Sequence, residues 1–128
     1  MEEVNDLNTA RSRVSGDTGT ATSALMFGGS SAPRQQTESW NGSIWTETND
    51  MNQGRQYHAG SAANNTAGLA FGGVLSPADY TALAATEEWN ANISVGAWVT
   101  GGNMNTGRNN LNGNGAGTTT AALIAGGN

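Results

Sequence analysis

The sequence predicts an all-β protein whose short strands are joined by tight turns. Its 128 residues include 19 glycines together with many asparagine, threonine, alanine and serine residues, and only 12% are charged. Glycine and asparagine supply the positive φ angles that tight turns require. No stretch keeps the 3.6-residue apolar period of a helix over a helical length, and only residues 80–89 (YTALAATEEW) allow a helical turn. Internal repetition then decides the architecture.

Three segments repeat one pattern without gaps: NDLNTARSRVSG, NDMNQGRQYHAG and GNMNTGRNNLNG. Their recurring arginines are Arg11, Arg55 and Arg108, and the first glycine of a Gly-Gly pair follows each one after 17, 17 and 18 residues. Each pair closes a short apolar stretch, SALMF, AGLAF or AALIA. Small apolar residues in such a stretch favour an inner β-strand that is buried on both faces.

A pair of tryptophans lies between successive copies. Trp40 and Trp45 flank Asn41-Gly42, which is a strong short-range signal for a β-hairpin, and Trp89 and Trp98 repeat the arrangement. The arginines are 44 and then 53 residues apart. The extra nine residues fall in the LSPADY and NANISVG segments, five in the first and four in the second, and we expect both to be surface loops.

A 44-residue repeat with four β-compatible segments is typical of a β-propeller blade, which is a four-stranded antiparallel sheet. We therefore expect one repeat array over residues 1–128, with copies at approximately 1–45, 46–98 and 99–128. The third copy would place its tryptophan at about position 143, so the array should form an incomplete ring of roughly two and two-thirds blades. Because a propeller closes with roughly four to eight blades, we expect a longer polypeptide or assembly with other copies, ahead of a laboratory fragment.

The order of these motifs resembles the kelch repeat: an apolar strand, Gly-Gly, a polar gap, a second strand, a tryptophan and then N-x-M/L-N-x-x-R. This resemblance implies a kelch-like β-propeller. The Asn/Gly/Thr/Ala-rich composition and the motifs of these repeats are also similar to those of repeats in phage structural and tail-fibre proteins and in environmental bacterial surface proteins. The first copy departs from the pattern, because Met1 stands at its tryptophan position, and the third copy has Gly-Asn in place of Asn-Asp. The matching positions are Gly28-Gly29, Trp45, Asp50-Met51 and Arg55, followed by Gly72-Gly73, Trp98, Met104 and Arg108.

Composition argues against several functional classes. The net charge of −5 and the absence of lysine leave no basic face for nucleic acid. No apolar run approaches the roughly 20 residues that cross a bilayer, so we expect no membrane insertion. The chain has no cysteine, and His58 is its only histidine, so neither a zinc site nor a catalytic triad can be assembled. We expect His58 to be a packed or surface side chain, and we predict no catalytic, cofactor or metal site.

Charged and aromatic residues beside the repeats are the remaining candidates. Glutamates recur near the tryptophan hairpins at strand-like spacing, and we expect them to face outward into solvent; they are Glu38, Glu47, Glu87 and Glu88. The repeated arginines should tie loops to strands through backbone carbonyls or a carboxylate such as Asp6 or Asp50. The tryptophans should pack between blades. The alternative is ligand contact, with the arginines receiving an acidic glycan and the aromatic side chains stacking on sugars; the candidates are Tyr80, Trp98, Arg11, Arg55 and Arg108.

These features predict a non-enzymatic structural or adhesion protein in a virion, as a phage tail fibre or decoration, or in an extracellular filament. Its partners would be other copies of itself or the remainder of a longer chain, together with other virion or fibre proteins. The alternative is a carbohydrate-binding β-propeller module that recognises cell-surface glycans through exposed loops. A galactose-oxidase-like enzyme on the same scaffold would need a cysteine, and none is present.

Overall fold

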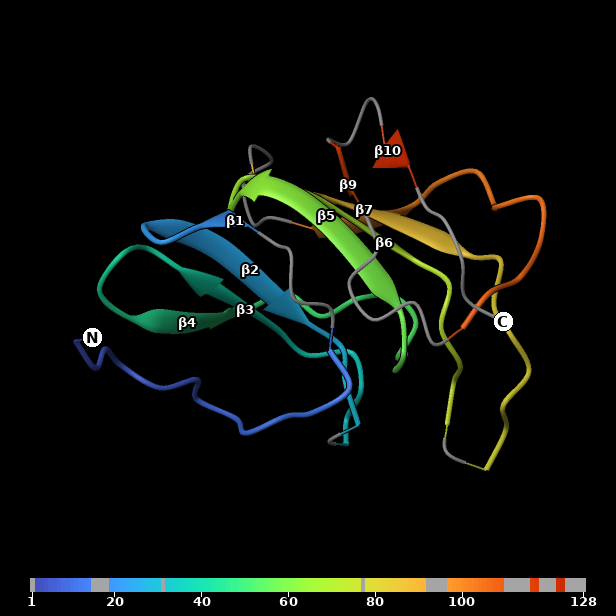
Figure 1. Cartoon of the computed structure of the whole chain (residues 1–128), viewed down its shortest axis with the longest axis horizontal. Coiled ribbons are helices and arrows are strands. Elements are labelled where there is room, and N and C mark those ends of the chain that lie inside the picture. The colour runs from blue at the N-terminus through green and yellow to red at the C-terminus, as the bar shows by residue number, and fades with distance from the viewer. Residues whose placement is uncertain are drawn as a thin grey trace.

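The computed structural model describes residues 2–14, 19–30, 32–76, 78–91, 97–109, 116–117 and 122–123. Within these residues every regular element is a β-strand, and two four-stranded antiparallel sheets form the body of the protein (Figure 1). The predicted all-β class and its four-stranded, blade-like sheets are therefore confirmed. No helix in the described part of the chain is long and apolar enough to cross a membrane.

The first sheet follows the chain in the order β1-β2-β3-β4. Its hairpin around Asn41 forms as predicted, and it sets Trp40 opposite Trp45. The Asn41 side chain stabilises the turn, because its Oδ1 accepts the backbone N–H groups of Ser43 and Ile44 at 2.9 and 3.0 Å. The strands are β1 (Gly19–Thr20), β2 (Ser23–Phe27), β3 (Thr37–Trp40) and β4 (Trp45–Thr48).

The second sheet repeats this order as β5-β6-β7-β8, and it sets Trp89 opposite Trp98. The helical turn allowed over residues 80–89 is wrong, because this stretch is irregular up to residue 85 and then enters β7. Strands pair with β7 on both edges, which satisfies backbone groups that a single isolated turn would leave unpaired. The strands are β5 (Ala59–Asn64), β6 (Ala67–Phe71), β7 (Thr86–Asn90) and β8 (Ala97–Thr100).

The two inserted loops fall between strands of the second sheet. In the LSPADY loop, Leu75, Asp79 and Tyr80 are exposed, as expected of a surface loop. Most of the NANISVG loop lies outside the described residues. A third strand pair, β9 (Ala116–Gly117) with β10 (Ala122–Leu123), lies beyond the second sheet, and β10 falls within the third predicted apolar strand. β9 lies against β5, just as β5 lies against β1 and β2.

The Gly-Gly pairs lie where the backbones of neighbouring copies meet. Gly29 donates its N–H to the carbonyl of Arg55 at 2.9 Å, and Gly73 donates to the carbonyl of Arg108 at 2.6 Å. Gly73 has a φ of +89°, and an added Cβ would lie 2.6 Å from the carbonyl oxygen of Gln56. Only glycine fits this conformation and this approach. The repeated glycines therefore fix the spacing between copies.

The main apolar core lies between the two four-stranded sheets. It joins residues of the first sheet to the tryptophans of the second, and its buried members are Leu25, Phe27, Met51, Ala70, Trp89 and Trp98. Trp98 contacts Phe27 edge-on, with their ring centroids 4.9 Å apart, so this tryptophan packs between blades as expected. A smaller cluster pairs Ala59 with Phe71, and Leu69 and Met104 pack against it.

Candidate functional site

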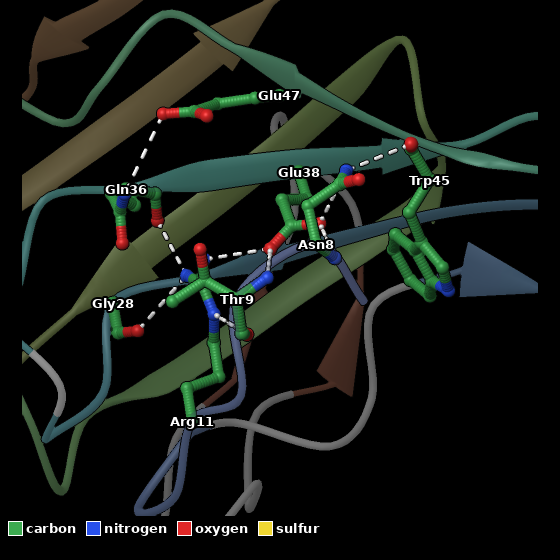
Figure 2. Close-up of polar contacts among 8 residues, drawn as sticks. All are labelled: Asn8, Thr9, Arg11, Gly28, Gln36, Glu38, Trp45 and Glu47. Atoms are coloured by element: carbon green, nitrogen blue, oxygen red, sulfur yellow. Dashed lines mark hydrogen bonds and ion pairs between the residues drawn. The ribbon is translucent and has the colours of Figure 1, made fainter. Parts of the chain in front are cut away.

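A buried carboxylate organises the loop that precedes the first sheet. Glu38 lies on β3, and its Oε2 accepts the backbone N–H of Asn8 at 2.8 Å and the Asn8 side-chain amide at 3.0 Å (Figure 2). Its Oε1 accepts the backbone N–H of Thr9 at 3.2 Å and the Arg11 guanidinium at 2.9 Å. The same Asn8 amide also donates to the carbonyl of Trp45 at 2.9 Å. This arrangement attaches the N-terminal segment to both strands of the tryptophan hairpin.

Arg11 extends the cluster to the connection between β2 and β3. Its Nη1 donates to the carbonyl of Gly28 at 3.2 Å and to that of Gln36 at 2.8 Å, as Figure 2 shows. The guanidinium therefore joins both ends of the loop that follows the Gly-Gly pair. Its planar set of donors suits this combination of one carboxylate and two carbonyls.

The second sheet contains the same cluster. The Oε2 of Glu87 accepts the backbone N–H of Asn52 at 2.7 Å, and its Oε1 accepts the backbone N–H of Gln53 at 3.0 Å and the Arg55 guanidinium at 2.9 Å. Arg55 also donates to the carbonyls of Gly72 and Ala85 at 3.1 and 2.9 Å. The Asn52 amide reaches the carbonyl of Trp98 at 2.9 Å. Two copies thus share one hydrogen-bonding scheme. We call these the first and second Arg–Glu clusters.

Both Arg–Glu clusters are removed from solvent. The side chains of Arg11 and Glu38 are 2% and 1% exposed, and those of Arg55 and Glu87 are 0% and 2% exposed. Desolvation lowers the pKa of Arg55, and the charge of Glu87 and its hydrogen bond oppose that shift. A buried ion pair is tolerated only when hydrogen bonds satisfy its remaining atoms. Hydrogen bonds hold both carboxylates in place, although the buried Nε of Arg55 has no hydrogen-bonding partner in the described part of the chain. These clusters are therefore fixed structural contacts.

The expectation that all four glutamates face solvent is wrong for Glu38 and Glu87. Neighbouring residues of a strand point to opposite faces, so Glu88 is exposed where Glu87 is buried. Glu47 is exposed as expected. Arg11 and Arg55 do bind backbone carbonyls, but their carboxylate partners are these glutamates instead of the expected aspartates. The recurring T-E-x-W sequence ahead of each hairpin, in the same repeat as the arginine, was the signal for this pairing.

The residues predicted to contact a ligand lie in different environments. Arg11 and Arg55 belong to the two Arg–Glu clusters. Trp98 is 4% exposed, and its indole N–H donates to the Oγ1 of Thr37 at 3.0 Å. Arg108 occupies the third repeat position, where its N–H donates to the carbonyl of Leu83 at 3.0 Å.

Tyr80 differs from the other predicted contacts because it is 58% exposed. It follows Asp79, whose side chain accepts the N–H of Thr81 at 3.0 Å, and this hydrogen bond lowers the pKa of Asp79. Across the described ranges, no group of three or more histidine, cysteine, aspartate or glutamate side chains could hold a metal ion.

His58 is a packed side chain, which was one of its two expected environments. It is fully buried, its ring lies 5.4 Å from that of Phe27, and neither ring nitrogen has a hydrogen-bonding partner among the described residues. Burial, helped by the nearby charge of Arg55, lowers the pKa of His58 to about 3. The other two copies carry Val14 and Leu111 at the equivalent position. His58 is therefore a neutral residue at an apolar position of the repeat.

A cavity of about 220 Å³ opens beside β6. Its lining comes from β6, from the start of β7, from the segment after β8 and from β10: Leu69, Phe71, Thr86, Gly102, Asn103, Met104 and Ala122. The cavity forms between copies, so no single sequence motif encodes it.

Searches against protein-family models and against curated proteins found no match to this chain. The candidate function therefore depends on the chemistry of the clusters and the cavity.

Proposed function

We propose that this chain is a non-enzymatic structural and adhesion protein built from kelch-like β-propeller repeats. It would serve in a virion, as a tail fibre or decoration, or in an extracellular filament. The observation that carries this proposal is the repeated Arg–Glu cluster. In each of two copies, the buried arginine and glutamate hold strand connections in place, which is a structural role.

The hydrogen bonds between neighbouring copies also support a structural repeat array. The Asn65 amide donates to the carbonyl of Trp40 at 3.0 Å, and its backbone N–H donates to the Oγ of Ser23 at 2.9 Å. Together with the glycine contacts, these bonds connect one copy to the next through backbone groups. Such nearest-neighbour contacts are typical of repeat proteins, in which each unit is stabilised by the units beside it.

The test is to locate the protein in its native setting. We expect mass spectrometry of purified extracellular filaments or virus particles to detect peptides of this chain. Immunogold labelling should then place it along the fibre or on the particle surface. Exclusive recovery from the soluble fraction, as a free protein without particle or filament partners, would contradict the proposal.

Carbohydrate binding is the second candidate, and the exposure of Tyr80 favours it. Its ring is 58% exposed in an inserted loop, and Leu75 in the same loop is 39% exposed. An exposed aromatic ring offers an apolar face and a polar hydroxyl, a combination that suits sugars. On a glycan array, Tyr80→Ala should abolish any binding, whereas Ile44→Ala, which removes an exposed apolar side chain on the other sheet, should retain it. An array without signal for the unmodified protein would eliminate this candidate.

A further inference from the structure

The cavity beside β6 has a counterpart in the first sheet that is occupied. Four of the cavity residues, Leu69, Phe71, Thr86 and Met104, match four residues at the same repeat positions, Leu25, Phe27, Thr37 and Met51. At those four residues the structure shows what the wall accepts. Trp98 lies edge-on to Phe27 at 4.9 Å, and its indole N–H donates to the Oγ1 of Thr37. The cavity therefore repeats a wall that binds an indole.

The segment beside the cavity is held in place as its counterpart is. The N–H of Met51 donates to the carbonyl of Gln35 at 2.8 Å, and that of Met104 donates to the carbonyl of Ala84 at 2.8 Å. The Gly29–Arg55 and Gly73–Arg108 backbone bonds also recur. These contacts give residues 102–108 the same attachment to the second sheet that residues 49–55 have to the first.

In the first two copies this segment binds a hairpin of one sequence type. The arginine and two backbone N–H groups bind the glutamate of the T-E-x-W strand, and the asparagine amide binds the carbonyl of the second tryptophan. The third copy carries the same donors as Arg108, Asn105 and Thr106. Asn105 and Thr106 are exposed. The third copy thus carries the residue types of the carboxylate-binding segment, in the stretch that includes the cavity residue Met104.

We propose that this clamp and cavity form a binding site for a β-hairpin with T-E-x-W on its first strand and a tryptophan on its second. The hairpin would lie beside β10 as β3–β4 lies beside β2, by addition of strands to an edge. Its glutamate would bind Arg108 and the N–H groups of Asn105 and Thr106, and its second tryptophan would enter the cavity. The occupant is a polypeptide of this repeat type from outside the 128 residues. This inference rests on the proposed structural function and names its partner.

The direct test uses a synthetic peptide, TESWNGSIWTET, which copies residues 37–48. Titrated into the 128-residue protein in a calorimeter, it should bind saturably with one peptide per chain. Trp45→Ala in the peptide should weaken binding about a hundredfold, because buried tryptophans dominate such interfaces. Glu38→Gln in the peptide should weaken it about tenfold, because hydrogen bonds to charged groups are the stronger kind.

Matched variants of the protein locate the site. Thr86→Val keeps the side-chain shape but removes the hydroxyl that would accept the indole N–H, so it should weaken binding several-fold. Thr37→Val makes the same change where Trp98 is already bound, and it should leave peptide affinity unchanged. Arg108→Ala should weaken the unmodified peptide but not the Glu38→Gln peptide, because a double-mutant cycle isolates their pairwise contact.

Three results would overturn the inference. The first is a lack of saturable binding at millimolar peptide, and the second is binding that neither Thr86→Val nor Arg108→Ala alters. The third is concentration-dependent self-association of the protein that Trp45→Ala in the protein abolishes, because it would assign the site to a second copy of the chain. None of these results bears on the filament and particle experiment, so the structural function and this site can fail separately.

Discussion

The two four-stranded sheets share their polar contacts but differ in their apolar ones. Each Arg–Glu cluster is completed by residues of its own copy. The two clusters share six hydrogen bonds, and the first adds bonds from the Asn8 amide to Glu38 and from Arg11 Nε to the carbonyl of Thr9. The contacts of Trp98 with Phe27 and Thr37 cross between copies. Trp98 is buried because the first sheet covers it, whereas Trp45 at the same repeat position is only half-buried. The Arg–Glu hydrogen bonds are therefore local to each copy, whereas the burial of Trp98 depends on the neighbouring copy.

The largest effect should come from breaking one Arg–Glu cluster. Glu87→Ala leaves Arg55 charged and buried, which should lower the free energy of unfolding by about 3–5 kcal/mol. Glu38→Ala should cost a similar amount, because the first cluster has an equivalent ion pair with similar burial. Urea denaturation measures both, with Glu47→Ala as an exposed control that should change stability by less than about 0.5 kcal/mol. A small effect at Glu38 beside a large one at Glu87 would show that the clusters are not equivalent.

Truncating the equivalent tryptophans of the two sheets should lower stability by different amounts. Trp98→Ala should cost about 3 kcal/mol or more, the usual cost of deleting a buried aromatic side chain. Trp45→Ala should cost about half as much or less, since that ring is only half-buried and no neighbouring sheet among the described residues covers it. Equal losses in urea denaturation would contradict the claim that burial of these residues depends on the neighbour.

Acid should weaken the interface at His58, where the first copy carries Val14. The folded protein holds the pKa of His58 at about 3, below the ordinary value of about 6.5. The unfolded chain therefore binds the proton first. Stability should be complete above pH 6.5 and should fall by about 1.4 kcal/mol per pH unit below it, until about pH 3. Leu111 is the third copy's residue at this position, so His58→Leu is the matched control. If another group causes the acid sensitivity, the free energies of unfolding of the wild type and of this variant should fall in parallel as the pH is lowered.

The smallest effect concerns one hydroxyl. Thr37→Val removes the acceptor of the Trp98 indole N–H and should cost about 1 kcal/mol. Thr86→Val makes the same change at the cavity, where Trp98 does not reach, and should cost less than Thr37→Val. Thermal unfolding of the two variants checks this order, and the reverse order would argue against the repeat equivalence of the two walls.

Much of the fold could be predicted because its signals are local. The Gly-Gly pairs, the Asn41-Gly42 turn and the recurring arginines each lie within a few residues of the structure they specify. Glu87 and Glu88 show where such reasoning stops. They are adjacent and chemically alike, and only the strand register decides that Glu87 faces the arginine. The cavity is harder still to predict from the sequence. Its walls come from β6, β7 and the following copy, and no sequence window contains them together.

The nine inserted residues of the second copy leave its Arg–Glu cluster unchanged. The insertions fall after Val74 and after Asn90, outside every bond of that cluster. A copy of this kind can therefore be duplicated as a genetic unit and then acquire new loop sequences without losing the hydrogen bonds of its Arg–Glu cluster. Variation among copies should accumulate in these two loops, where Tyr80 already stands exposed, and an engineered array could display chosen peptides there.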